Sequence, residues 1–323
     1  MFDLPPQDDK QEKKAWLLLE KAVLASTVEQ RRSRRWGILF KSLTFLYLFV
    51  ILLTFVAGMN ATNEATGEHA AVIEIRGVIA DNEDASADRI IGALRNAYKN
   101  PDVKAIIFRI NSPGGSPVQS GYVYDEINRL RALHPDIKVY AVITDIGASG
   151  AYYIASAADQ IYADKASLVG SIGVTGAGFG FVGAMEKLGV ERRSYTSGEH
   201  KAFLDPFQPL KQDEAQFWDG VLGTVHKQFI EVVKKGRGDR LKETPDLFSG
   251  LIWSGEQALT MGLIDGLGSS SYVARDVAKI PEGRLVNYTV TDSPLDRFAK
   301  KLGASISSEL ATKMGMQATP RLQ

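Results

Sequence analysis

The chain has 323 residues, no cysteine, and 38 basic against 38 acidic side chains. With 45% hydrophobic and 24% charged residues, it falls outside the disordered and disulfide-scaffold classes, and its neutral total argues against general nucleic-acid binding. The lack of cysteine excludes a thiol nucleophile, a disulfide and a thiolate metal site.

The charge is uneven along the chain, because residues 1–41 carry nine basic and six acidic side chains just before the longest apolar run. Residues 42–58 form 17 consecutive positions without a charge. A spanning helix needs about 20 apolar residues, and Lys41 can reach the interface, so we predict a transmembrane helix over residues 38–58. A buried core helix would show a polar stripe, and a cleavable signal peptide would have a shorter lead.

The basic residues before this helix predict its orientation. Residues 31–41 carry five positive charges, whereas residues 60–70 carry only Glu64 and Glu68. The positive-inside rule then predicts a single-pass protein with its N-terminus in the cytoplasm and its body on the opposite side of the membrane. In a cell with two membranes, that is a protein of the inner membrane with a periplasmic body. Residues 9–30, within a cytoplasmic segment 1–37, show an amphipathic pattern that could contact the membrane or a partner, or remain a solvated helix.

Beyond a linker over residues 59–69, short β-branched runs alternate with helical patterns. We predict strands over 71–80, 103–111, 138–146, 160–165 and 169–174, and helices over 85–99, 116–133, 149–158, 211–235, 254–261 and 271–280. This alternation is typical of an α/β body, residues 70–291, with a parallel sheet and flanking helices. We expect residues 234–242 to form an exposed loop, and residues 292–323 to form a partly ordered tail.

Two glycine-rich turns follow predicted strands. One is Asn-Ser-Pro-Gly-Gly-Ser at residues 111–116, and the other is Gly-Ala-Ser-Gly-Ala at residues 147–151. Ligands of open α/β sheets bind at the carboxyl ends of strands, where such turns can hold a phosphate or a developing oxyanion. Neither turn matches a phosphate-binding loop with Gly-Lys-Ser, and both could simply be tight connections between a strand and a helix.

Ser149 is the candidate nucleophile in the second turn, although a serine at a helix start often only caps the helix. As a nucleophile it needs a base. His200 and Lys201 lie together in a loop with other site-like features, and the residues alone leave the choice between them open.

Four segments in order give the chain a specific resemblance. They are NSPGG at 111–115, GASGAYYIASAAD at 147–159, VGSIGV at 169–174 and SGEHKAFLDPF at 197–207. Together they resemble the signal peptide peptidase family of bacterial serine peptidases, in its short form with one anchor. A later segment, residues 257–265, is similar to the wider crotonase and Clp-protease fold, and the likeness covers about residues 70–268.

The resemblance implies a role for each matching residue. Ser149 would be the nucleophile, Lys201 the general base, and Ser171 the residue that orients the lysine. The backbone N–H groups of Gly115 and Gly150 would form the oxyanion hole, with Gly114 shaping the turn. His200 would point away from the site in an extended segment, and we expect Phe203, Leu204 and Phe207 to surround Lys201 with apolar surface.

The implied function is a membrane-anchored serine endopeptidase that degrades cleaved signal peptides and other apolar peptides through an acyl-enzyme. The resemblance further implies a crotonase/Clp-protease-like body, a homo-oligomeric ring, peptide substrates, and no metal or organic cofactor. Two other functions stay open, a crotonase-fold acyl-CoA enzyme and an inactive peptide-binding membrane scaffold.

Overall fold

The computed structural model describes residues 9–60 and 67–291. The chain divides into two compact units, Met1–Glu64 and Ala65–Gln323. The tail predicted over residues 292–323 lies outside the described residues. The second unit, called the body below, contains both glycine-rich turns and the candidate site.

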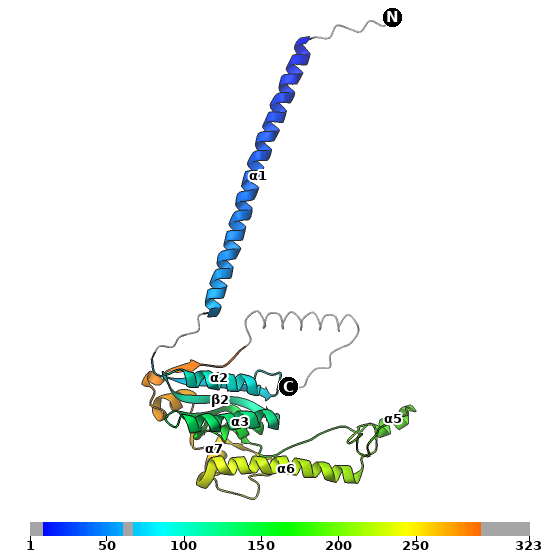
Figure 1. The fold of residues 1–323 in the computed structure, drawn as a ribbon, viewed down its shortest axis with the longest axis vertical. Coiled ribbons are helices and arrows are strands. Elements are labelled where there is room, and N and C mark those ends of the chain that lie inside the picture. The colour runs from blue at the N-terminus through cyan, green and yellow to red at the C-terminus, as the bar shows by residue number, and fades with distance from the viewer. Residues whose placement is uncertain (1–8, 61–66, 292–323) are drawn as a thin grey trace. The chain divides into compact units, whose positions relative to one another are not determined.

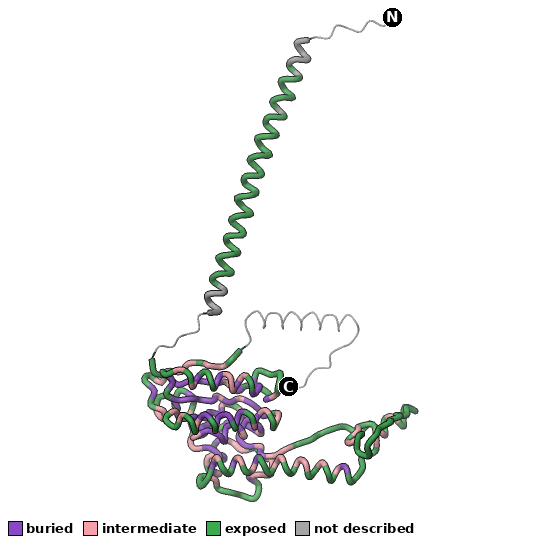
Figure 2. Tube along the Cα trace, viewed as in Figure 1, coloured by how far each residue is buried: buried purple, intermediate pink, exposed green. Residues whose placement is uncertain are grey.

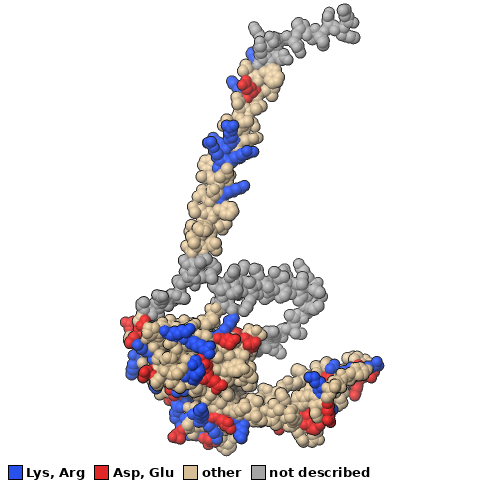
Figure 3. Space-filling model, viewed as in Figure 1, with Lys and Arg blue, Asp and Glu red and all other residues tan. Residues whose placement is uncertain are grey.

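The first unit holds one unbroken helix, α1 (Asp9–Asn60). The amphipathic helix and the transmembrane helix that we predicted separately are therefore parts of a single 52-residue helix, which at about 1.5 Å per residue is about 78 Å long. Within it, Trp16–Thr54 is the one stretch of the described residues long and apolar enough to cross a membrane. Basic side chains gather in the middle part of the helix (Figure 3), where Arg31, Arg32, Arg34, Arg35 and Lys41 lie.

The body is built on one mostly parallel sheet (Figure 1). Its strands are β1 (His69–Ile79), β2 (Val103–Gly115), β3 (Lys138–Ala148), β4 (Gln160–Ala163), β5 (Leu168–Gly170), β6 (Ile252–Ser254), β7 (Gly266–Leu267) and β8 (Leu285–Asn287). The order is β6-β5-β3-β2-β1-β8, with β4 pairing with β3 and β7. Only β6 runs antiparallel to its neighbour, β5. The predicted α/β class is confirmed.

The body contains helices at all six places where the sequence predicts one, and a further helix, α5, that it does not predict. They are α2 (Ala87–Lys99), α3 (Pro117–Leu133), α4 (Gly150–Ala155), α5 (Val182–Leu188), α6 (Gln212–Arg237), α7 (Gly255–Thr260) and α8 (Ser270–Tyr272), with short turns η1 (Gly238–Arg240), η2 (Val273–Val277) and η3 (Pro281–Gly283). In α2, the apolar residues Ile90, Leu94 and Ala97 recur at helical spacing and are buried. Ser116 caps α3, since its hydroxyl accepts a hydrogen bond from Gln119 N at 3.3 Å.

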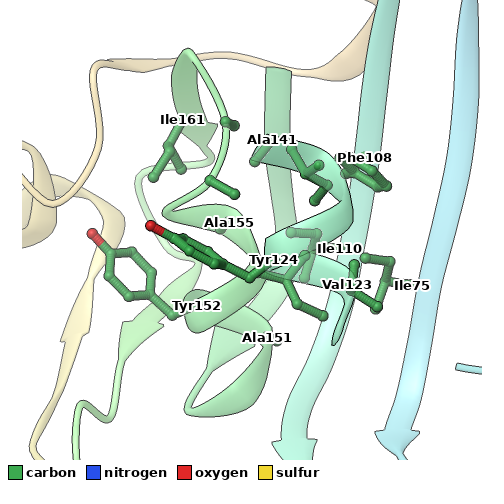
Figure 4. Close-up of a cluster of buried hydrophobic side chains, with 14 of the residues drawn as sticks. Ile75, Phe108, Ile110, Val123, Tyr124, Ala141, Ala151, Tyr152, Ala155 and Ile161 are labelled. Atoms are coloured by element: carbon green, nitrogen blue, oxygen red, sulfur yellow. The ribbon is translucent and has the colours of Figure 1, made fainter. Parts of the chain in front are cut away.

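The core lies between the sheet and the helices α2, α3 and α4 (Figure 2). Figure 4 shows Ala151 and Ala155 of α4 in one buried cluster with Val123 of α3 and Ile110 of β2. The Tyr152 hydroxyl, fully buried, donates to Leu263 O at 2.6 Å. These contacts hold the short helix α4, and with it the turn that carries Ser149, against the sheet.

Two element predictions are wrong. The loop or mobile segment expected over residues 234–242 is instead the last turn of α6 followed by η1; most of its residues are exposed as expected, but Arg237 is only 1% exposed. The strand expected over residues 169–174 ends at Gly170, because Ser171 turns the backbone into the left-handed region at φ 51°. The charge of Arg237 favoured an exposed position. The side chain is buried instead, because it pairs with the carboxylate of Asp265.

A long segment between β5 and α6 projects from the sheet and carries α5 at its far end (Figure 1). We call residues 174–211 the arm. Almost all of the arm is exposed (Figure 2), including the large apolar side chains Phe179, Leu188, Tyr195 and Leu210. An isolated subunit therefore leaves considerable apolar surface in contact with water.

A charge cluster joins α2 to α3 and predicts acid sensitivity. Glu126 is 8% exposed and accepts hydrogen bonds from Arg129 at 2.7 Å and from Arg95 of α2 at 2.7 Å. Hydrogen bonding from Arg129, helped by Arg95, lowers the pKa of Glu126 from 4.5 to about 2. Because the folded pKa lies below the unfolded one, this stabilisation is present above pH 4.5 and is lost as the pH falls toward 2.

We therefore expect Glu126→Gln to destabilise the body at neutral pH, and the difference from wild type to shrink as the pH falls from 4.5 toward 2. Urea unfolding across this pH range measures it. A difference that stays constant over the whole range would contradict the role of the ionised carboxylate.

Candidate functional site

A pocket of about 310 Å³ lies where β2, β3 and β5 end. Gly115 is the last residue of β2, Ser149 follows β3, and Ser171 follows β5, and all three line this pocket together with Gly150. The sheet explains the convergence, because β2 and β5 both pair in parallel with β3, so their carboxyl ends meet at one edge. We call it the Ser149 pocket.

Ser149 has an unusual backbone conformation, with φ 53° and ψ −125°. A residue other than glycine held in this region is strained, and such strain is found at functional sites that the surroundings hold in place. Its N–H donates to Gly170 O at 2.8 Å, and its carbonyl accepts from Tyr153 N at 2.9 Å. The hydroxyl makes no capping hydrogen bond to α4, so the simple helix-cap role considered for Ser149 is not what the structure shows.

The two glycine-rich turns touch each other. A side chain at Gly114, where φ is +99°, would place its Cβ 2.7 Å from both Ala148 O and Gly150 N. A Cβ at Gly115 would overlap the backbone of Ile79 in the neighbouring strand. Only glycine fits these two positions, and the close fit brings the backbone of the first turn against Ser149 and Gly150.

Gly150 supplies a backbone donor at the pocket. It is the first residue of α4, and the first amides of a helix have no acceptor within the helix. A Cβ at Gly150 would lie 3.4 Å from Gly115 N, so the two backbones are close neighbours. The pair can therefore direct N–H groups at one point beside the Ser149 side chain, which is the arrangement that stabilises an oxyanion.

Lys201 does not line the Ser149 pocket. It lies in the arm, exposed, in a turn near Gly198. Phe203 packs against Phe217 and Trp218 of α6, with ring centroids 5.8 and 5.9 Å apart, so it does not cover the lysine with apolar surface as we expected. Within one chain, the structure thus assembles Ser149, Ser171, Gly115 and Gly150, and leaves Lys201 outside.

The histidines have other partners. His200 Nδ1 lies 3.5 Å from the Glu214 carboxylate, and His226 Nε2 lies 3.0 Å from Ile172 O. His69 contacts Gly67 O and the Tyr288 hydroxyl, and His134 stacks on Tyr98. None of these four rings lines the Ser149 pocket.

The pocket has a wall that the sequence analysis did not identify. Val225, Gln228 and Phe229 of α6 face it, as do Ser249 and Gly250 from the loop before β6. The apolar spacing of α6 predicted a helix, but nothing in that spacing says which surface the helix covers. No charged side chain is among the described residues that line the pocket, and Tyr153, whose pKa burial raises, remains a neutral phenol there.

A second, larger pocket of about 680 Å³ lies on the arm. Its lining includes the glycine-rich segment of the arm around Gly178, together with Leu210 and Trp218. It shares no lining residue with the Ser149 pocket. In the described part of the chain, no group of three or more His, Asp or Glu side chains could hold a metal ion.

The chain is similar to a known protein family and to several known proteins. The model of peptidase family S49 matches residues 131–282, which include Ser149, Ser171 and Lys201. A putative signal peptide peptidase SppA of Enterococcus faecium is 30% identical over 278 residues, covering 81% of this chain and 79% of that protein. Protease 4 of Haemophilus influenzae is 31% identical over 252 residues, covering 76% of this chain and 40% of that protein.

A further relative carries a different name. The Na(+)/H(+) antiporter NhaA of Brucella melitensis biotype 1 is 48% identical over 177 residues, which are 55% of this chain. The chain spans only 24% of the length of that protein. The similarity thus concerns a part of the antiporter chain.

Proposed function

This chain belongs to peptidase family S49, the signal peptide peptidases, and we propose that it is a membrane-anchored serine endopeptidase of apolar peptides. The observation that carries the proposal is the Ser149 turn. A strained serine with an uncommitted hydroxyl lies in a pocket beside two adjacent glycine backbones. The mostly parallel sheet with flanking helices fits the Clp-protease-like body expected for this family.

In the proposed mechanism, Ser149 attacks the peptide carbonyl while the neutral Lys201 amine accepts its proton. The negative charge that develops on the carbonyl oxygen is stabilised by the N–H groups of Gly115 and Gly150. Collapse of the intermediate expels the amine, which takes the proton from Lys201, and leaves an ester on Ser149. Water, deprotonated by Lys201, then attacks the ester and releases the carboxylate, and Ser149 recovers its proton. Ser171 orients the lysine.

The Lys201 that serves one Ser149 comes, in this proposal, from a neighbouring copy of the chain. Lys201 is exposed on a projecting arm and does not line the pocket of its own chain. A head-to-tail contact between copies would place each arm over the next pocket, and such contacts close into rings. The same contact would cover exposed apolar side chains of the arm and remove the lysine from water, which favours its uncharged form.

The substrate class follows from the pocket and the anchor. The pocket wall of Tyr153, Val225 and Phe229 is uncharged and favours apolar side chains. Within the stretch of α1 able to span a membrane, the uncharged run at residues 42–58 follows the basic residues of 31–41, so we propose a cytoplasmic N-terminus and a periplasmic body. Signal peptides left in the membrane after secretory cleavage are the apolar peptides available there.

The test is hydrolysis of a fluorogenic apolar peptide by the full-length protein in detergent or liposomes. We expect Ser149→Ala to lower kcat by at least about 1,000-fold and His200→Ala to keep activity near that of wild type. A serine-reactive peptide phosphonate should add its mass at Ser149 and nowhere in Ser149→Ala.

Other results of the same assays would support the alternative functions or an alternative general base. Equal peptide hydrolysis by wild type and Ser149→Ala would contradict the serine mechanism, and binding of the peptide without hydrolysis would favour an inactive scaffold. Turnover of an acyl-CoA thioester in place of the peptide would favour the crotonase-type enzyme. Loss of activity in His200→Ala and not in Lys201→Ala would show that His200, and not Lys201, is the general base.

A further inference from the structure

Two serines lie buried beneath the glycine-rich turns, and the mechanism above does not use them. Ser112 and Ser120 are both 0% exposed. Ser112 is in the last part of β2, three residues before Gly115, and Ser120 is in the first turn of α3. Neither side chain lines the Ser149 pocket.

Ser112 holds the first turn. Its hydroxyl accepts a hydrogen bond from Gly114 N at 3.1 Å. Gly114 and Gly115 have φ values of +99° and +153°, and consecutive glycines in such conformations have wide freedom unless a contact restricts them. The hydrogen bond fixes the Gly114 amide, and through it the direction of the next one, Gly115 N–H.

Ser120 holds the second turn. Its hydroxyl donates to Ser116 O at 3.0 Å, and Ser116 N donates in turn to Ile79 O of β1 at 2.8 Å. The Ser120 oxygen also lies against the Cα of Gly150, in the space that a Cβ there would need. The hydroxyl therefore sets how closely the start of α4 approaches α3 and the first turn.

We propose that Ser112 and Ser120 are positioning residues, which set the direction and spacing of the two oxyanion-hole amides of Gly115 and Gly150. This inference rests on the proposed function, because it assigns a role within the same peptidase site. A buried serine bound to backbone could serve stability alone. Here, however, each hydroxyl contacts the backbone of one oxyanion turn directly, Ser112 at the Gly114 amide and Ser120 at Gly150.

The test compares Ser112→Ala and Ser120→Ala with a matched control, Ser156→Ala. Ser156 is also a buried serine, 1% exposed, and its hydroxyl donates to Tyr153 O at 2.6 Å, but it lies after the last turn of α4 and does not line the pocket. For the full-length protein we measure kcat and KM on an apolar fluorogenic peptide, the inactivation rate by a peptide phosphonate, and the unfolding midpoint.

The two test variants should lower kcat and the limiting inactivation rate together by about 10- to 100-fold, with KM within about twofold of wild type. Ser156→Ala should keep the kcat of wild type, although we expect its unfolding midpoint to fall by about as much as those of the two test variants. The inference is overturned if Ser112→Ala and Ser120→Ala keep the kcat of Ser156→Ala, or if all three lose activity in proportion to stability. An inactive wild type, or an active Ser149→Ala, would instead mark failure of the proposed function.

Discussion

Two inactive variants, Ser149→Ala and Lys201→Ala, are expected to recover peptide hydrolysis when they are produced together. The Lys201→Ala chain keeps an intact Ser149, and the Ser149→Ala chain keeps an intact Lys201. Because Lys201 is exposed on the arm and does not line the pocket of its own chain, a mixed assembly can bring one intact residue of each kind together. With random mixing in a head-to-tail ring, about one quarter of the sites should be complete.

The experiment uses two purification tags, so that assemblies containing both chains are isolated before the assay. Each variant expressed alone is the control and should be inactive. Mixed assemblies that form and remain inactive would contradict the exchange of Lys201 between copies and require the lysine to reach Ser149 within its own chain. The outcome is separate from the Ser149 labelling test, which asks only whether Ser149 is the nucleophile.

Replacing Arg237 by methionine should have the largest effect on stability. The Arg237 side chain is 1% exposed and pairs with both carboxylate oxygens of Asp265 at 2.7 and 2.8 Å, while its Nε donates to Gly262 O. Burial acts to raise the pKa of Asp265, but the hydrogen bonds and charge of Arg237 hold it below its ordinary value. Removing the arginine leaves a largely buried carboxylate without its main partner, which should cost about 3–5 kcal/mol of unfolding free energy.

A matched surface pair is the control. Arg193 pairs with Glu191 on the arm at 3.0 Å, with both side chains more than 70% exposed, so Arg193→Met should change the unfolding free energy by less than about 1 kcal/mol. Urea unfolding measures both variants. Adding Asp265→Asn to Arg237→Met should cost much less than the two single effects summed, because the residues are coupled. Similar small effects of Arg237→Met and Arg193→Met would refute this account.

The Arg237 pair also matters for the site. It fixes the end of α6, whose residues Val225, Gln228 and Phe229 form one wall of the Ser149 pocket. The turn that it binds also receives the hydrogen bond from Tyr152 of α4, at Leu263 O. One buried cluster thereby connects two helices that border the pocket.

Local patterns predicted most elements of the body. The apolar spacing of α2 and the runs rich in β-branched residues of β2 and β3 were sufficient, because a helix or strand must bury an apolar face. The same reasoning failed at residues 234–242, where three lysines, two arginines and two glycines suggested an exposed loop. Burial of Arg237 depends on Asp265, 28 residues away along the chain, and local composition carries no trace of such a pair.

The sequence by itself determined the class of fold, the apolar span, the two glycine-rich turns and the serine within the second of them, because each depends on neighbouring residues only. It also excluded a cysteine nucleophile, since the chain has no cysteine. The tertiary structure alone decided which of these residues meet. Parallel pairing brings the ends of β2, β3 and β5 to one edge, so Gly115, Ser149 and Ser171 share a pocket, whereas Lys201 follows the arm away from the sheet into solvent. Residue types encode the chemistry, and the pairing of strands decides where that chemistry can take place.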